Sequence, residues 1–221
     1  MVLNPYIGLV KTVKRLSLMG ITLFLAIGSL FAGPEPVRHE PFTYYFDSPA
    51  YISRADSTLR QTRARLQRLL QDDLDFKADI FLVETEEAFD SLTGGQFPHW
   101  GAAAAIPVWN RIVIKSPDHF QVGRPLRELL QHEYAHLALE KRTGLNRPPR
   151  WFNEGLAMMA SMEWSWQNNL TMSQAAVLGE LIPLRQIEGM NIFSESRARQ
   201  AYAQSYLAVE YMFEQYGVEA V

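Results

Sequence analysis

The chain has 221 residues, of which 48% are hydrophobic and 20% are charged, as expected for a globular protein with a core of its own. Its formal net charge of -3 at pH 7 gives no reason to expect nucleic acid or an anionic surface as a partner. Because there is no cysteine, disulfides and cysteine-ligated metals are excluded, and any metal must be held by histidine, aspartate or glutamate.

The N-terminus has the pattern of a targeting segment. A basic stretch over residues 11–15 precedes an uncharged apolar run over residues 16–32, which Gly33 and Pro34 end. We expect a cleaved signal peptide, with a retained membrane anchor as the alternative. Either form would export the rest of the chain. We therefore predict a periplasmic or cell-envelope protein that meets the membrane only through residues 1–33.

Residues 34–221 have the pattern of one α+β domain, because strands are predicted first and helices dominate the second half. The predicted strands cover residues 42–46, 78–83, 102–105 and 111–115, the last of them central and the alanine-rich one at an edge. The predicted helices cover residues 50–71, 86–92, 125–142, 156–162, 174–181 and 196–216, with a polar and aromatic loop at 164–169. The arginines of the first helix indicate a solvated face, since the net charge argues against nucleic acid.

The helix over residues 125–142 carries an H-E-x-x-H pattern at residues 132–136. Residues four apart lie on one helix face, about 6 Å apart along the axis, so the imidazoles of His132 and His136 can reach one small cation. Glu133 is one step round the helix and can reach a water on that cation without being a ligand. Two neutral nitrogen ligands, an open coordination position and a neighbouring base are what a zinc hydrolase needs.

Two histidines do not make a stable zinc site, so a third ligand is required. Glu154 is the candidate, because it opens an apolar helical run after a proline pair at residues 148–149. A chain that leaves the first helix, turns and returns as a second helix can place Glu154 against His132 and His136. The preceding Asn153 either orients a ligand histidine or caps the second helix, and we favour the cap.

The combination of H-E-Y-A-H with a later W-F-N-E-G-L-A resembles the gluzincin branch of the zincin metallopeptidases, and in particular the peptidase MA-like domains of bacteria. A pattern Y-x-x-S…Y…Y-G over residues 202–217 is similar to a late helix of that family. The resemblance covers roughly residues 40–217. It implies a zincin-like fold with a small mixed sheet, an edge strand at the cleft and a helical half, and one zinc ion with Glu154 as its third ligand.

The resemblance also implies substrate-binding and catalytic roles. In this family an edge strand near the cleft pairs with the extended substrate, which implies substrate binding by Gly101, Ala103 and Ala105. From the residues alone, a small-residue strand packed under a helix explains the alanine run equally well. A tyrosine of the late helix stabilises the oxyanion in the family. Tyr202 matches that position, with Tyr206 in reserve, and core packing is the competing explanation for either tyrosine.

These features predict zinc-dependent hydrolysis of peptide bonds, with Glu133 taking a proton from water and delivering it to the leaving nitrogen. Zinc aminopeptidases with the same two helices carry an acid in a G-x-M-E-N segment, where this chain reads G-A-A-A-A-I. The missing acid favours an endopeptidase acting on peptide or protein substrates. Two alternatives stay open: a non-catalytic, zinc-containing envelope protein that binds a partner, and an amidase that acts on a cell-wall component. Glu133 argues against the first, because a structural zinc site has no use for a base.

Overall fold

The computed structural model describes residues 35–46, 48–95, 97, 101–144 and 146–217. The predicted targeting segment, residues 1–33, lies outside the described residues, so its cleavage and the export of the chain stay predictions. Within the described part of the chain, no helix combines the length and the hydropathy needed to cross a bilayer.

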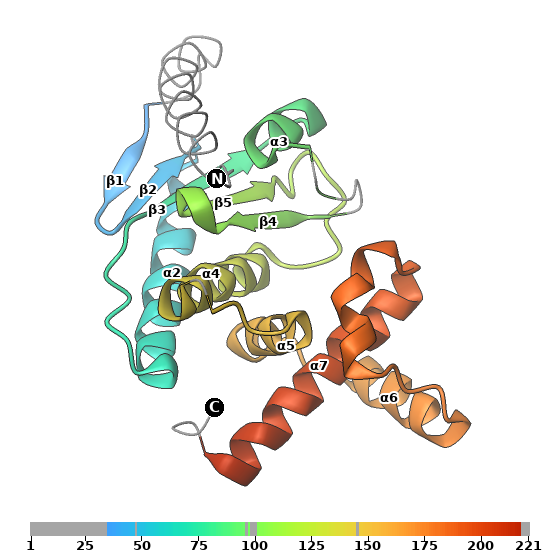
Figure 1. Cartoon of the computed structure of the whole chain (residues 1–221). Coiled ribbons are helices and arrows are strands. Elements are labelled where there is room, and N and C mark those ends of the chain that lie inside the picture. The colour runs from blue at the N-terminus through green and yellow to red at the C-terminus, as the bar shows by residue number, and fades with distance from the viewer. Residues whose placement is uncertain (1–34, 47, 96, 98–100, 145, 218–221) are drawn as a thin grey trace, which may run out of the picture. The chain divides into compact units, whose positions relative to one another are not determined.

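A five-stranded mixed sheet forms the first half of the fold (Figure 1). The order of its strands is β1-β2-β3-β5-β4, with parallel pairs in the centre and an antiparallel pair at each edge. The strands are β1 Val37–His39, β2 Phe42–Tyr45, β3 Ala78–Val83, β4 Ala103–Ile106 and β5 Arg111–Lys115. Strand β1 was not predicted, because three residues are too short for a local pattern and depend on pairing with β2.

Strand β5 is central, as its sequence predicts. All five of its residues are buried, which is typical of a strand covered on both faces. Its side chains alternate between two cores. Ile112 and Ile114 join the main hydrophobic core with residues of α2 (Pro49–Leu70) and α4 (Leu126–Thr143), whereas Val113 packs on the other face with Phe89 of α3 (Glu86–Thr93). Strand β4 is the edge strand beyond it, which confirms the predicted order of these two strands.

Helices cover both faces of the sheet and form the second half of the fold (Figure 1). They are α2 Pro49–Leu70, α3 Glu86–Thr93, α4 Leu126–Thr143, α5 Arg150–Ser161, α6 Trp166–Leu178 and α7 Glu195–Tyr216, with short 3-10 turns η1 Pro107–Trp109 and η2 Leu184–Ile192. Helix α3 lies on one side of the sheet and α2 and α4 lie on the other. The predicted α+β class, with a small mixed sheet followed by a helical half, is confirmed.

Helix α5 links the sheet-covering layer to the last helix, since it packs against both α4 and α7. The α5 and α7 backbones approach each other closely at Gly155. A Cβ atom built there would lie 2.3 Å from the carbonyl oxygen of Ser205 and 2.6 Å from the Val209 side chain. Only glycine allows this approach, so Gly155 sets the spacing of the two helices.

Two helix starts differ from the prediction. Helix α5 begins at Arg150, earlier than the predicted opening at Glu154, because Pro149 occupies the N-cap position with a ψ of 147° and a helix can start directly after it. Helix α6 begins at Trp166, so the predicted loop at 164–169 is wrong for most of its length. Its buried residues Met172 and Ala175 lie toward α7, a tertiary contact that no local pattern reveals.

Candidate metal centre

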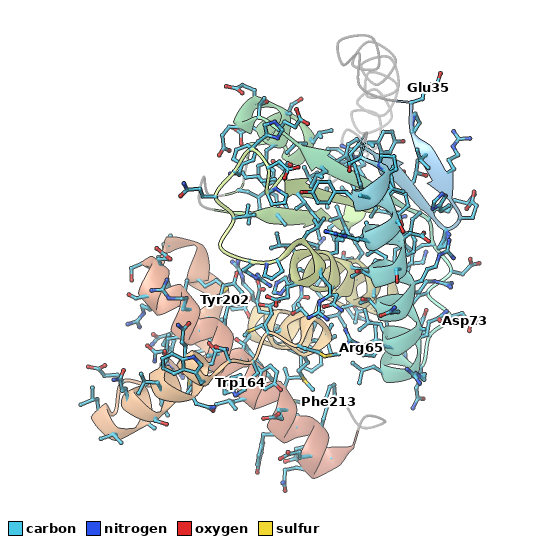
Figure 2. The ribbon with its side chains drawn as sticks, turned by 180° about the vertical axis from the view of Figure 1, so that it is seen from behind. Glu35, Arg65, Asp73, Trp164, Tyr202 and Phe213 are labelled. Carbon is cyan, nitrogen blue, oxygen red and sulfur yellow. The ribbon has the colours of Figure 1, made fainter. Side chains whose placement is uncertain are left out.

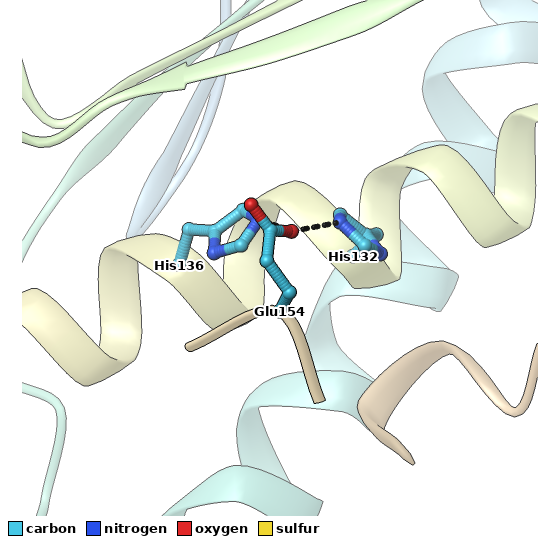
Figure 3. Close-up of side chains that lie close together, drawn as sticks. All are labelled: His132, His136 and Glu154. Carbon is cyan, nitrogen blue, oxygen red and sulfur yellow. Dashed lines mark ion pairs between the residues drawn. The ribbon is translucent and has the colours of Figure 1, made fainter. Parts of the chain in front are cut away.

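Three predicted ligands meet where α5 crosses α4. His132 and His136 stand one turn apart on α4, with ring centroids 4.8 Å from each other. Glu154, in the first turns of α5, points its carboxylate between them (Figure 3). Its Oε2 atom lies 3.6 Å from the Nε2 atom of each histidine. One ligand atom from each residue falls within 4.8 Å of the others, a spacing that a single ion can bridge.

Both histidines are held by their other ring nitrogen. His132 Nδ1 lies 2.8 Å from Glu163 Oε1, and His136 Nδ1 lies 2.8 Å from Asn153 Oδ1. Carboxylate and amide oxygens accept hydrogen bonds, so each ring donates through Nδ1, and its Nε2 atom is turned toward Glu154. The N-cap of α5 is Pro149, so the favoured reading of Asn153 as a helix cap is wrong.

The two oxygens of Glu154 differ in their surroundings. Oε1 accepts from the guanidinium Nε of Arg150 at 3.3 Å, whereas Oε2 is buried and has no hydrogen-bond donor. A buried carboxylate oxygen without a partner is costly, and a cation between it and the two Nε2 atoms would remove that cost. Two imidazole nitrogens and a carboxylate oxygen are also a donor set that zinc accepts. The residues therefore fit a divalent metal such as zinc.

We call His132, His136 and Glu154 the cluster, and its electrostatics favour the binding of a cation. Burial opposes ionisation of Glu154, but the 3.6 Å approach of His132 and the positive charges that His136, His132 and Arg150 can carry outweigh it and lower the pKa of this carboxyl. Burial alone would lower the pKa of His132, yet the surrounding carboxylates of Glu163, Glu154 and Glu133 raise it. The site is thus a buried, anionic pocket that holds a cation more readily than a neutral group.

Glu163 is a functional candidate that sequence reasoning missed. Its Oε1 atom contacts the guanidinium of Arg124 and the hydroxyl of Ser161 as well as His132 Nδ1. These groups, with the charge of His132, outweigh burial and lower the pKa of Glu163. The residue follows α5 after Met162, which caps the helix in the left-handed conformation and turns the chain back. The only local signal for Glu163 was an acidic residue just after the helix that carries Glu154. Such an acid has no fixed sequence spacing from the metal ligand, so the sequence did not identify it.

The structure places the remaining predicted catalytic residues around the cluster. Glu133 follows His132 on α4 and is 7% exposed. Tyr202, on α7, has its ring centroid 6.3 Å from that of His132 (Figure 2). Burial, Glu154 and Glu133 together raise the pKa of Tyr202, so its hydroxyl keeps its proton and can donate. Tyr206 is engaged elsewhere, since its hydroxyl donates to Glu210.

Strand β4 carries the predicted substrate-binding residues next to α4. Ala103 and Ala105 pair with β5 in an antiparallel register and are half-buried, facing the main core. Gly101 precedes the strand and is half-buried too. In the described sheet β4 has β5 on one side and no strand on the other. The alanine side chains therefore pack under a helix while the backbone of β4 forms a sheet edge, and pairing of that edge with a substrate stays a prediction.

A cavity of about 650 Å³ adjoins the cluster on the side of Asn153 and Glu154. Its other walls come from the end of α4, the connection to α5 and the two 3-10 turns: Pro107, Glu140, Arg147, Pro148, Pro149, Arg150 and Glu188. Pro107 directly follows β4, so the edge strand leads toward this cavity. Space for a ligand is therefore present beside Glu154, one of the three candidate metal ligands.

A family model described as the peptidase MA superfamily matches residues 58–221, a range that includes all three candidate ligands, Glu133, β4 and Tyr202. No curated protein matches the chain.

Proposed function

The chain belongs to the peptidase MA superfamily, and from this premise we propose that it is a zinc-dependent endopeptidase. Membership supports a peptidase-type hydrolase that uses a metal and acts on peptides or proteins. Zinc as the metal, and cleavage within a chain, are the finer parts of the proposal. The observation that carries it is the unpartnered Oε2 atom of Glu154, which lies 3.6 Å from both histidine Nε2 atoms.

In the proposed reaction His132, His136 and Glu154 hold the metal, which supplies Lewis acidity toward a water molecule and the scissile carbonyl. Glu133 accepts the proton of the attacking water and passes it to the leaving nitrogen. The protonated hydroxyl of Tyr202 donates a hydrogen bond to the carbonyl oxygen as negative charge develops there. The open edge of β4 binds the extended substrate backbone as an added strand.

The endopeptidase part of the proposal depends on what borders the cluster. The segment before and within β4 reads G-A-A-A-A-I over residues 101–106, so it offers no carboxylate to a substrate's free amine. The strand edge and the cavity beyond Pro107 give a substrate room to extend from the cluster. An extended chain is the substrate shape that these surfaces suit.

The test is Glu133→Gln in the full chain, with zinc content and digestion of a peptide library measured on the same preparation. We expect proteolysis to fall by at least about 100-fold, since general base catalysis contributes that much, while the zinc content is unchanged. Glu128→Gln, in the first turn of the same helix, is the matched control and should cleave like the wild type.

Two outcomes would contradict the proposal. If Glu133→Gln cleaves as well as Glu128→Gln, Glu133 is not the base. If the wild type binds one zinc ion per chain and cuts no peptide, the non-catalytic envelope protein or the cell-wall amidase replaces the endopeptidase.

We also propose that the chain is exported, because a basic stretch precedes an apolar run over residues 16–32. Fractionation of cells that express the full chain tests this. Recovery in the cytoplasmic fraction with residues 1–33 intact would refute it.

A further inference from the structure

Helix α2 carries five arginines, of which Arg65 has unusual surroundings. Arg60, Arg63 and Arg68 each donate a hydrogen bond to a carboxylate or carbonyl oxygen. Arg65 is half-buried (Figure 2), and its Nε and Nη2 atoms are shielded from solvent with no hydrogen-bond partner among the described residues. The arginine pattern of this helix predicted a solvated face, and Arg65 departs from that prediction.

The charge that acts on Arg65 is positive. Burial and the guanidinium of Arg127 lower the pKa of Arg65. Arg127 is exposed in the first turn of α4, the helix against which α2 packs. Within the described part of the chain no carboxylate forms an ion pair with either arginine, and this includes Glu128 of the same turn. The two guanidinium groups therefore have no negative charge from the protein to balance them.

Gln131 adds a third polar side chain with an unused hydrogen-bonding atom. It stands one helical turn after Arg127 on α4, so the two residues share a helix face. Gln131 is 6% exposed, and its Oε1 atom has no donor among the residues that the structure describes. A buried amide that stays unpaired costs free energy. Because the two ends of an amide have nearly the same shape, the group can turn either its oxygen or its NH2 toward a ligand.

These residues lie apart from the metal centre. At 3.6 residues per turn, the side of α4 that carries Arg127 and Gln131 stands about 140° around the helix from the side that carries His132 and His136. None of Arg65, Arg127 and Gln131 is among the described walls of the cavity beside Glu154. A ligand held by them would therefore be separate from the metal and from a peptide substrate.

We propose that Arg65, Arg127 and Gln131 bind a small divalent oxyanion, of the sulfate or phosphate type, between α2 and α4. The planar guanidinium group presents paired donors that match the oxygens of such an anion, and two guanidinium groups balance its two charges. The buried position of the Arg65 nitrogens favours a free anion over a phosphate group carried by a large molecule.

Two other partners for Arg65 explain less. A water molecule accepts a hydrogen bond from the guanidinium but leaves its charge unbalanced. A direct hydrogen bond between Arg65 and the side-chain oxygen of Gln131 would satisfy both buried groups, yet the charges of Arg65 and Arg127 would still repel each other. Only an anion provides both the acceptor and the negative charge.

Thermal unfolding of the full chain tests the proposal, with sulfate as the probe. The protein is first freed of metal over a chelating resin, so the anion cannot act through the metal centre. Chloride is then replaced by millimolar sulfate at constant ionic strength. We expect a saturable rise of several degrees in the melting temperature, because a ligand that binds only the folded state stabilises it. Phosphate should act like sulfate, and acetate, with one charge, should act more weakly.

Arg65→Met and Arg68→Met form a matched pair on α2. Arg68 donates to the Ala64 carbonyl within the helix, so Arg68→Met should keep the response to sulfate. Arg65→Met should lose it, and in chloride alone this variant should melt no lower than the wild type, because it removes a buried cation that has no partner. Arg127→Met changes an exposed side chain, and in calorimetry it should weaken sulfate binding at least about tenfold.

Two results would overturn the proposal. If sulfate raises the melting temperatures of Arg65→Met and Arg68→Met equally, its effect is the general one of an excluded salt. If the wild type melts at the same temperature in chloride and in sulfate, Arg65 is satisfied by Gln131 or by water instead.

Discussion

Glu154 uses its two carboxylate oxygens differently, and the difference organises the cluster around it. Arg150, one helical turn earlier, holds Oε1 and so fixes the rotation of the carboxylate. Oε2 is left facing His132 and His136, whose rings are held from behind by Glu163 and Asn153. Protein contacts therefore hold the three candidate ligands in orientation, which would lower the entropy that they lose when they bind a metal.

The hydrogen bond from His132 to Glu163 predicts a defect in metal affinity. Glu163→Gln keeps the shape of the side chain but removes the charge that raises the basicity of the ring. We expect zinc affinity, measured by competition with a chelator, to fall about 10–100-fold. The control is Glu195→Gln. It removes an exposed carboxylate that forms an ion pair with Arg199, and it should leave the zinc affinity unchanged. Equal affinities for the two variants would contradict the role of Glu163.

The two late tyrosines give a matched pair for catalysis. Tyr202→Phe keeps the ring that packs near His132 and removes only the hydroxyl. Because loss of one oxyanion donor lowers kcat by about 10²–10³-fold, we expect a fall of this size with little change in KM or zinc content. Tyr206→Phe, whose ring stacks on Trp164 and whose lost hydroxyl donates to Glu210, should keep kcat. A Tyr202→Phe enzyme with wild-type kcat would leave Tyr202 with core packing only.

At the scale of elements, α5 has most influence on the site. Its first turns carry Asn153 and Glu154, and the chain just beyond its last turn carries Glu163. Between them, Gly155 holds α7 in close contact, and Tyr202 stands on α7. A change in the position of α5 therefore moves a ligand, two supporting side chains and the proposed oxyanion donor together.

Gly155→Ala tests that dependence. The new Cβ atom would lie 2.3 Å from a backbone oxygen of α7, which no side-chain rotation can relieve. We expect a loss of about 1–3 kcal/mol of stability, as in other overpacked cores, and a lower kcat because Tyr202 shifts with α7. Thermal unfolding and peptide cleavage measure the two effects. Gly189→Ala is the control, since its Cβ atom would meet nothing within 4 Å and its φ is negative. Equal melting temperatures for the two variants would contradict the close approach.

At the scale of the whole molecule, the metal centre joins the two halves of the fold. The sheet-covering helix α4 supplies two candidate ligands and α5, in the helical half, supplies the third. An ion bound by all three would tie the halves together in the folded state and has no equivalent site in the unfolded chain. Metal binding should therefore stabilise the entire fold.

We expect added zinc to raise the melting temperature of the chain. Zinc at 100 times its dissociation constant stabilises by about 2.7 kcal/mol, which is about 5–10 °C for a domain of this size. The measurement uses the Glu133→Gln protein, so that self-digestion does not interfere. Glu154→Gln on that background is the control and should lose most of the shift. A melting temperature that zinc leaves unchanged would contradict a metal bound by these residues.

Much of the fold follows from local patterns. The apolar runs of β3 and β5 and the periodicity of α2, α4 and α7 are properties of consecutive residues, so their types and approximate bounds could be predicted. The predicted start of α5 was late, and most of the loop expected before α6 is helix. At α5, Pro149 in the N-cap position allows the helix to start before its apolar run. At α6, the packing of Met172 and Ala175 outweighs the polar composition of the first turn.

The sequence by itself determined that His132 and His136 share a helix face with Glu133 beside them, because helical geometry sets the relation of residues one to four apart. It also pointed to Glu154 as the third ligand, through the helix that the residue opens. Only the tertiary structure decided that Glu163 and Asn153 hold the rings of His132 and His136. It also decided that Gly155 sets the spacing between α5 and α7, and that Trp166 and Val177 of α6 are exposed. Those relations join residues on separate elements, and their distances depend on how the helices pack.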